Sequence, residues 1–91
     1  TEIPKEYKLY QNFPNPFNPT TNINFDIIRS GNVRIIVYDL LGREVETLVN
    51  QDMSPGRYKF DFNAKDYASG LYIYKIVTHD FVDVKKMLII K

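Results

Sequence analysis

The feature that most constrains the fold of this chain is an apolar residue at every second position through most of its length. Residues 23–27 read Ile-Asn-Phe-Asp-Ile, and residues 57–62 read Arg-Tyr-Lys-Phe-Asp-Phe. A period of two is typical of a β-strand with one buried face, whereas a helix would repeat every 3.6 residues or so. The sequence therefore predicts strands rather than helices.

Seven strand segments are expected, with turn residues such as Ser30-Gly31-Asn32 between them: 7–11, 23–27, 33–38, 43–50, 57–62, 71–78 and 81–90. Within 43–50, Val45 and Leu48 fall out of phase, which a β-bulge or an edge position would explain. His79-Asp80 fits a tight hairpin between the last two segments. About seven short strands with turns roughly every 8–12 residues predict an all-β fold, an immunoglobulin-like antiparallel β-sandwich.

The inward positions of these strands define a predicted core. It consists of Ile23, Phe25, Val33, Ile35, Val37, Tyr58, Phe60, Phe62 and Tyr72. Tyr38 and Ile73 fall on the opposite face from their core neighbours. A Gly-x-Tyr pattern occurs at Gly56–Tyr58 and again at Gly70–Tyr72, and we interpret it as one device that starts a strand. The phenol of Tyr72 is expected to reach back to the loop backbone, as in a tyrosine corner.

A stiff, aromatic stretch, YQNFPNPFNPTT, precedes the first clear strand. Its prolines exclude a helix or a central strand, and two of them follow asparagines that favour turns. Phe13 and Phe17 would each leave a large ring to bury, so we expect a rigid clamp docked on the core, formed by Phe13, Pro14, Pro16, Phe17 and Pro19. The alternative is a proline-rich ligand for a partner domain, because a weak PxxP spacing is present.

Composition excludes several classes of protein. The 91 residues are enough for one domain, and the net charge is +1, with 12 basic and 11 acidic residues. This balance gives no basic footprint for nucleic acid and no polybasic membrane patch. There is no cysteine, so disulfides and thiolate metal sites are excluded. With neither an initiating Met nor a signal peptide, the chain is expected to be a piece of a longer protein, with residues 1–6 ending an interdomain linker and 7–91 forming the domain.

Side chains suited to catalysis or metal binding are few. His79 is the only histidine and lies in a predicted turn, whereas a catalytic imidazole needs a nucleophile and an oxyanion hole. Asp61, Asn63 and Asp66 are the best candidate calcium ligands, but they lack the glycine and distal Glu of an EF-hand loop. The aromatic rings mostly occupy inward positions, which favours core packing over a glycan-binding platform. We expect no enzyme activity, metal, cofactor or small-molecule substrate.

The last strand ends in four consecutive apolar residues flanked by lysines, in the sequence KKMLIIK at 85–91. A strand buried on both faces would give such an apolar run. The simplest interpretation is that the lysines prevent this apolar edge strand from pairing with strands of other chains.

Four stretches together suggest a family. LYQNFPNPFNPTTNINF (9–25), VYDLLGREVETLVN (37–50), SGLYIYKI (69–76) and KKMLIIK (85–91) resemble the type A C-terminal sorting domain of the type IX (Por) secretion system. They occur in the order typical of that family and span nearly the whole chain. The family often has glycine in the last hairpin, where this chain has His79-Asp80.

The resemblance implies a secretion tag. Such domains form immunoglobulin-like sandwiches at the C-terminus of cargo proteins from Bacteroidetes-like bacteria. The cargo crosses the periplasm and is then exposed at the cell surface or secreted. The implied partners are the outer-membrane translocon, a sortase-like protease and the N-terminal cargo domain of the same chain. The residues that match the family's motifs, and that the resemblance implies for translocon recognition, are Gly70, Tyr72, Lys85, Lys86, Met87 and Lys91.

Two other functions fit the sequence without the resemblance. One is a non-catalytic module that binds glycan or protein, and the other is an Ig-like spacer on a secreted enzyme. A glycan-binding module would need an exposed aromatic platform, whereas a sorting tag would need its terminal lysines.

Overall fold

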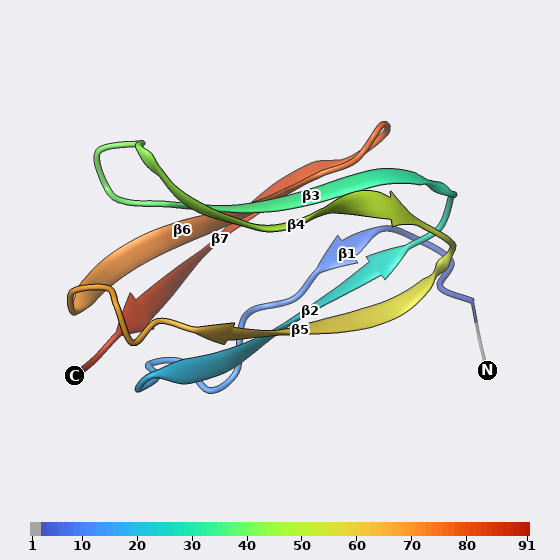
Figure 1. The fold of residues 1–91 in the computed structure, drawn as a ribbon. Helices are drawn as coiled ribbons and strands as arrows, with labels where there is room; N and C mark the ends of the chain where they lie inside the picture. The colour runs from blue at the N-terminus through green and yellow to red at the C-terminus, as the bar shows by residue number, and fades with distance from the viewer. Residues whose placement is uncertain (1–2) are drawn as a thin grey trace.

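The computed structural model describes residues 3–91 and contains two antiparallel sheets stacked face to face (Figure 1). The three-stranded sheet has the order β1-β2-β5, and the four-stranded sheet has the order β4-β3-β6-β7. The strands are β1 (Lys8–Leu9), β2 (Thr20–Ile27), β3 (Gly31–Tyr38), β4 (Glu44–Met53), β5 (Gly56–Asn63), β6 (Gly70–Val77) and β7 (Val82–Ile89). The prediction of an all-β sandwich of seven strands is confirmed.

The predicted core lies between the two sheets. Ile23, Phe25, Val33, Ile35, Val37 and Phe62 are each at most 2% exposed, whereas Tyr58, Phe60 and Tyr72 are half-buried and pack against the core from its margin. Other apolar side chains complete the core: Leu9, Phe17, Ile27, Val49, Ala64, Tyr74, Ile76, Met87 and Ile89. The core is thus built from alternate residues of the strands in both sheets.

Strand β4 carries the irregularity that the sequence predicted. The pairing of β3 with β4 shifts twice, so that Val45 and Leu48 have no direct partner on β3. Both side chains are half-buried and pack against the core. A bulge inserts one extra residue and turns the strand, so two out-of-phase apolar residues both reach the core face.

The two Gly-x-Tyr segments start their strands in the same way. The Tyr58 hydroxyl donates to the Ser54 carbonyl at 2.6 Å, and the Tyr72 hydroxyl donates to the Ala68 carbonyl at 2.9 Å. In each case the phenol reaches back four residues and fixes the turn that precedes the strand. The expected tyrosine corner at Tyr72 is confirmed.

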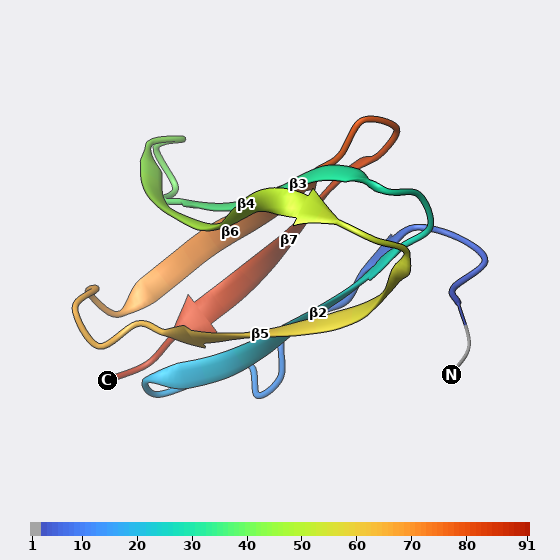
Figure 2. The ribbon, with the colours of Figure 1, turned by 45° about the vertical axis from the view of Figure 1, so that its right-hand side comes forward.

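The described chain runs from one end of the long axis of the sandwich to the other. Lys91 lies at the end that holds the β3–β4 and β5–β6 connections, and the N-terminal segment lies at the end that holds the β6–β7 hairpin (Figures 1 and 2). That hairpin closes through a bond from Thr78 N to the Phe81 carbonyl, 2.8 Å long. The predicted linker includes residues 1–2, which lie outside the described residues. Between residues 3 and 91 there is no helix long and apolar enough to cross a membrane.

Candidate functional site

The proline-rich stretch covers the free edge of β7. Phe17 N donates to the Leu88 carbonyl at 3.1 Å, and Ile90 N donates back to the Phe17 carbonyl at 2.9 Å. Leu88 N also donates to Asn15 Oδ1 at 2.9 Å. These bonds satisfy groups of β7 that face away from β6, so the C-terminal half of this edge strand is not free to pair with another chain.

The two phenylalanines of this stretch have opposite environments. Phe17 is 3% exposed and packs against the ring of Phe62, with centroids 6.2 Å apart. Phe13 is 76% exposed, so the prediction that it packs on the sandwich is wrong. Its backbone pairs with Asn22, which lies on the outward face of β2, and directly opposite residues share a face. The ring of Phe13 therefore points to solvent.

A buried polar network that sequence reasoning missed holds the proline turn. Asn12 is 2% exposed and donates through Nδ2 to Thr21 Oγ1 at 3.0 Å and to the Pro14 carbonyl at 3.2 Å. The Thr21 hydroxyl donates to the same Pro14 carbonyl at 2.8 Å. Pro14 and Pro16 are themselves exposed, while the Pro19 carbonyl accepts from Ala64 N at 2.8 Å. Polar bonds and one ring, rather than the proline rings, fix this segment.

The residues matched to the family's terminal motif do not form one cluster. Lys86 is exposed, Lys85 is half-buried, and Met87 has no exposed surface. Consecutive strand residues project to opposite faces, so Lys85 and Lys86 cannot contact one flat partner surface together. Lys91 lies beside the β5–β6 connection, where its backbone N donates to Ser69 Oγ at 3.0 Å.

Gly70 and Tyr72 lie at the start of β6, next to the end of β7. Gly70 pairs with Ile89 and Tyr72 pairs with Met87. Gly70 has φ +150°, a conformation that other residues rarely adopt. Both residues therefore shape the backbone against which the last strand is paired.

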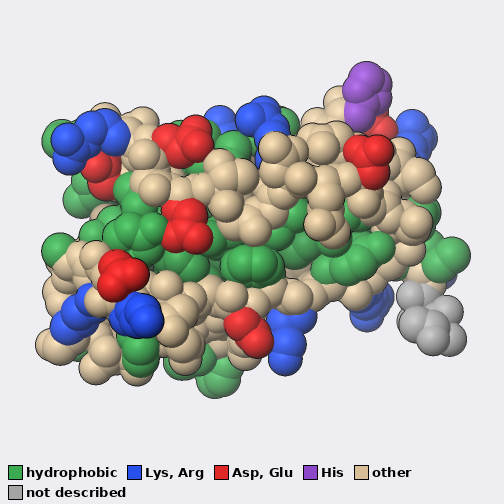
Figure 3. Space-filling model, viewed as in Figure 1, with side chains coloured by type: hydrophobic (Ala, Val, Ile, Leu, Met, Phe, Trp, Pro, Cys, Tyr) green, Lys and Arg blue, Asp and Glu red, His purple; other side chains and the backbone are tan. Residues whose placement is uncertain are grey.

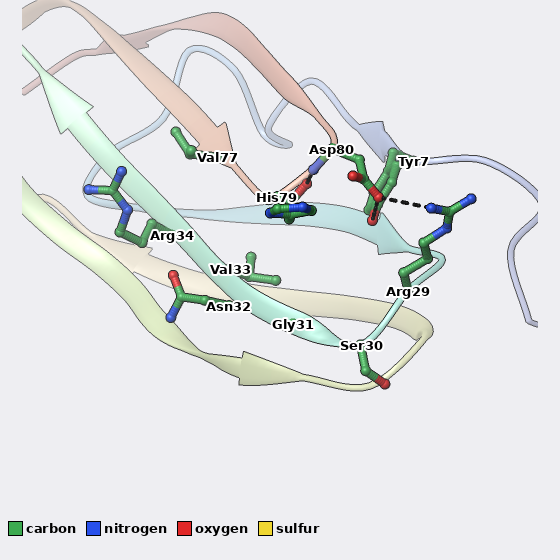
Figure 4. A pocket seen from close by; sticks show the side chains of 11 residues that line it. Tyr7, Arg29, Ser30, Gly31, Asn32, Val33, Arg34, Val77, His79 and Asp80 are labelled. Atoms are coloured by element: carbon green, nitrogen blue, oxygen red, sulfur yellow. Dashed lines mark hydrogen bonds and ion pairs between the residues drawn. The ribbon is translucent and has the colours of Figure 1, made fainter.

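A hollow lies where the β2–β3 turn meets the β6–β7 hairpin (Figure 4). Arg29 and Asp80 form an ion pair of 3.4 Å across it, and the Tyr7 hydroxyl donates to the same carboxylate at 3.5 Å. His79 and Arg34 line its wall (Figure 4). The Arg29 side chain is 73% exposed, so this contact is a surface ion pair whose contribution to stability is small.

Of the three candidate calcium ligands, Asn63 stabilises a turn through its side chain. Asn63 Oδ1 accepts a hydrogen bond from Lys65 N at 2.9 Å, and Asp61 and Asp66 are exposed. In the described part of the chain, no three His, Cys, Asp or Glu side chains come together as a metal site would require.

Two phenols have strongly raised pKa values for structural reasons. The hydrogen bond from the Tyr67 hydroxyl to Glu46, together with burial, raises the pKa of Tyr67 to about 12. Burial raises the pKa of Tyr74 to about 12, and its hydroxyl donates to the Tyr10 carbonyl at 2.7 Å. Both hydroxyls therefore act as hydrogen-bond donors near neutral pH.

Comparison with known proteins places this geometry in a family. The model of the secretion system C-terminal sorting domain matches residues 11–91. The solved structure of dimeric latent PorU from Porphyromonas gingivalis is similar, with a TM-score of 0.73 and 20% identity over 90% of this chain. The match covers 9% of the PorU chain, and at this identity it shows the fold alone. No curated protein matches the chain in sequence.

The family match covers both motif regions described above, the proline-rich segment and the terminal strand. Domains of this family are generally non-catalytic. The chain belongs to the secretion system C-terminal sorting domain family and is a sorting signal of the type IX secretion system.

Proposed function

We propose that residues 7–91 direct a cargo region on their N-terminal side through the outer-membrane translocon of the type IX system. The cargo would cross the periplasm first and reach the cell surface or the medium afterwards. A sortase-like protease is the proposed partner that removes the domain. The family match over residues 11–91 is the observation that carries this proposal.

The domain itself is proposed to have no catalytic activity, cofactor or metal. The polar side chains of the hollow between Arg29 and Asp80 form a surface ion pair, and His79 is exposed. Turn bonds account for Asn63. These contacts support structural roles for the polar side chains involved.

Burial suggests different roles for the terminal residues. Lys86 and Lys91 are exposed and are proposed to contact the translocon directly. Met87 is fully buried, so we propose that it anchors β7 in the core and thereby fixes the position of the adjacent residues of that strand. Gly70 and Tyr72 would set the position of that strand, because both pair with it.

The clamp is proposed to consist of the segment around Phe17, in which Pro14 and Pro19 take part through their backbone carbonyls and Pro16 is exposed. Its bonds to Leu88 and Ile90 support a role in holding the terminal strand in place. Phe13 is not needed for this docking, because its ring is exposed.

A reporter carrying a signal peptide and residues 1–91 should reach the surface or medium of a type IX-competent host. The same reporter without residues 1–91 should stay in the periplasm. Retention of the full fusion, in a host that still exports its own cargo, would contradict the sorting function.

A further inference from the structure

The two sheets of this sandwich have very different outer faces. On the three-stranded sheet every outward residue is polar: Lys8, Thr20, Asn22, Asn24, Asp26, Arg57, Lys59, Asp61 and Asn63. This is the usual pattern for an antiparallel sheet with one face in water. The four-stranded sheet departs from it.

We define the β3–β6–β7 face as the outward residues of β6 and β7 together with those of β3 from Arg34 onward, which leaves out Asn32 at the start of β3. Its members are Arg34, Ile36, Tyr38, Leu71, Ile73, Lys75, Val77, Val82, Val84, Lys86 and Leu88. Most are apolar, and the face belongs to the upper layer of Figure 1. Val82 is 60% exposed and Val84 is 51% exposed, Leu71, Ile73, Val77 and Leu88 are half-buried, and Ile36 at the centre is only 2% exposed. An exposed sheet face of this composition usually marks a protein interaction site.

The register arranges these side chains in rows across the three strands. Ile36, Lys75 and Val84 form one row, and Tyr38, Ile73 and Lys86 form the next. On the other side of the Lys75 row, Arg34, Val77 and Val82 form a third row. Each of these three rows contains one cation, and the cations step diagonally from β3 to β7, whereas the remaining pair, Leu71 and Leu88, is apolar.

Acidic residues are missing from the outward positions of these three strands, all of which lie within residues 3–91. Edge strand β4 has acidic side chains, with Glu44 opposite Tyr38 and Asp52 opposite Asn32, and Asp83 of β7 pairs with the buried Ile76 and so projects to the other face of the sheet. The interior of the face is therefore purely apolar and cationic. The Lys75 ammonium lies 5.3 Å from the centre of the Tyr38 ring, so one of these cations is already held against the surface.

We propose that the β3–β6–β7 face docks on an apolar surface with carboxylates, belonging to an outer-membrane component of the secretion machinery. This inference rests on the sorting function proposed above. Charge complementarity selects the occupant, because an acidic partner would pair with Arg34, Lys75 and Lys86 while apolar contacts cover the valines. A second copy of this chain would bring like cations together. A membrane surface is usually bound by about four to eight clustered basic residues, more than this face carries.

Matched neutralisations test the role of the charges. The variant Lys75→Gln/Lys86→Gln removes two cations from the face, and Lys8→Gln/Lys59→Gln removes two from the polar sheet. Each variant also removes one lysine that contacts a tyrosine ring. In the control the Lys8 ammonium lies 4.7 Å from the Tyr10 ring centre, which corresponds to the contact of Lys75 with Tyr38. We expect the first variant to slow export of the reporter fusion about tenfold and the control to change it less than about twofold, since charges at an interface steer association.

Both variants should unfold at nearly the wild-type temperature, which separates docking from folding. Equal export of both variants and of the wild-type fusion would overturn the proposed face while leaving the sorting function intact. Failure of the wild-type fusion itself would instead count against the sorting function.

Photocrosslinking identifies the occupant. A benzoylphenylalanine in place of Val84 should crosslink the exported fusion to an outer-membrane component of the machinery, and one in place of Lys59 should not. Crosslinks between two copies of the fusion, or equal capture from both positions, would overturn the proposal. So would binding of the purified domain to vesicles of outer-membrane lipid that is lost in Lys75→Gln/Lys86→Gln.

Discussion

Replacing Phe17 by Ala tests how firmly the proline-rich segment is docked. Its side chain is 3% exposed and contacts the core through Phe62. Truncating a buried Phe to Ala costs about 3–5 kcal/mol, through lost burial and the cavity left behind. A domain of this size has about 5–15 kcal/mol in total, so the variant should be close to the limit of folding.

The same motif provides the control. Phe13 is 76% exposed, and Phe13→Ala should change stability by less than about 0.5 kcal/mol. Urea unfolding can be followed by tyrosine fluorescence, because the chain has seven Tyr and no Trp. We expect a much lower midpoint for Phe17→Ala and a wild-type midpoint for Phe13→Ala. Equal midpoints for both variants would refute the assignment of Phe17 as the docking residue.

Two further predictions concern the buried and hydrogen-bonded phenols. Tyr74→Phe should cost about 1–3 kcal/mol, because it leaves the Tyr10 carbonyl without its donor; thermal unfolding measures this. In an ultraviolet titration of the folded protein, Tyr67 should ionise near pH 12, and Glu46→Ala, which removes the acceptor and its charge, should lower its pKa toward 10. Because the folded pKa is raised, the Tyr67 phenol stabilises the fold fully below pH 10, and that contribution is lost as the pH rises from 10 to 12. A Tyr67 pKa insensitive to Glu46→Ala would contradict the hydrogen bond.

The alternation of apolar and polar residues was enough to predict the strands and the irregular pairing of β4. Val45 and Leu48 break the alternation of their segment, and the structure places a bulge at each of them. The tyrosine corner was also predictable, because a short segment contains both the phenol and its acceptor. These features depend on residues close together in sequence.

Features that depend on distant pairing could not be predicted in this way. Phe13 and Phe17 have the same local chemistry, and only the pairing of Phe13 with Asn22 decides which ring faces water. Tyr38 and Ile73 could be assigned to the outward face, but their row with Lys86 follows from the register of β3, β6 and β7. Lys85 and Lys86 are adjacent in the sequence, and only the burial pattern of β7 shows that Lys85 lies on the inward face and Lys86 on the outward face.

The bonds between Phe17 and the end of β7 can form only after the last strand of the domain has been synthesised. Phe17 is synthesised before β2 to β7, yet its backbone N–H and carbonyl find their partners at Leu88 and Ile90, which are synthesised more than 70 residues later. A chain that stops before β7 leaves this segment without those partners and removes the β7 part of the β3–β6–β7 face. Truncated products would thus lack both a closed edge and a complete docking surface, so export would select for chains translated to the end of this strand.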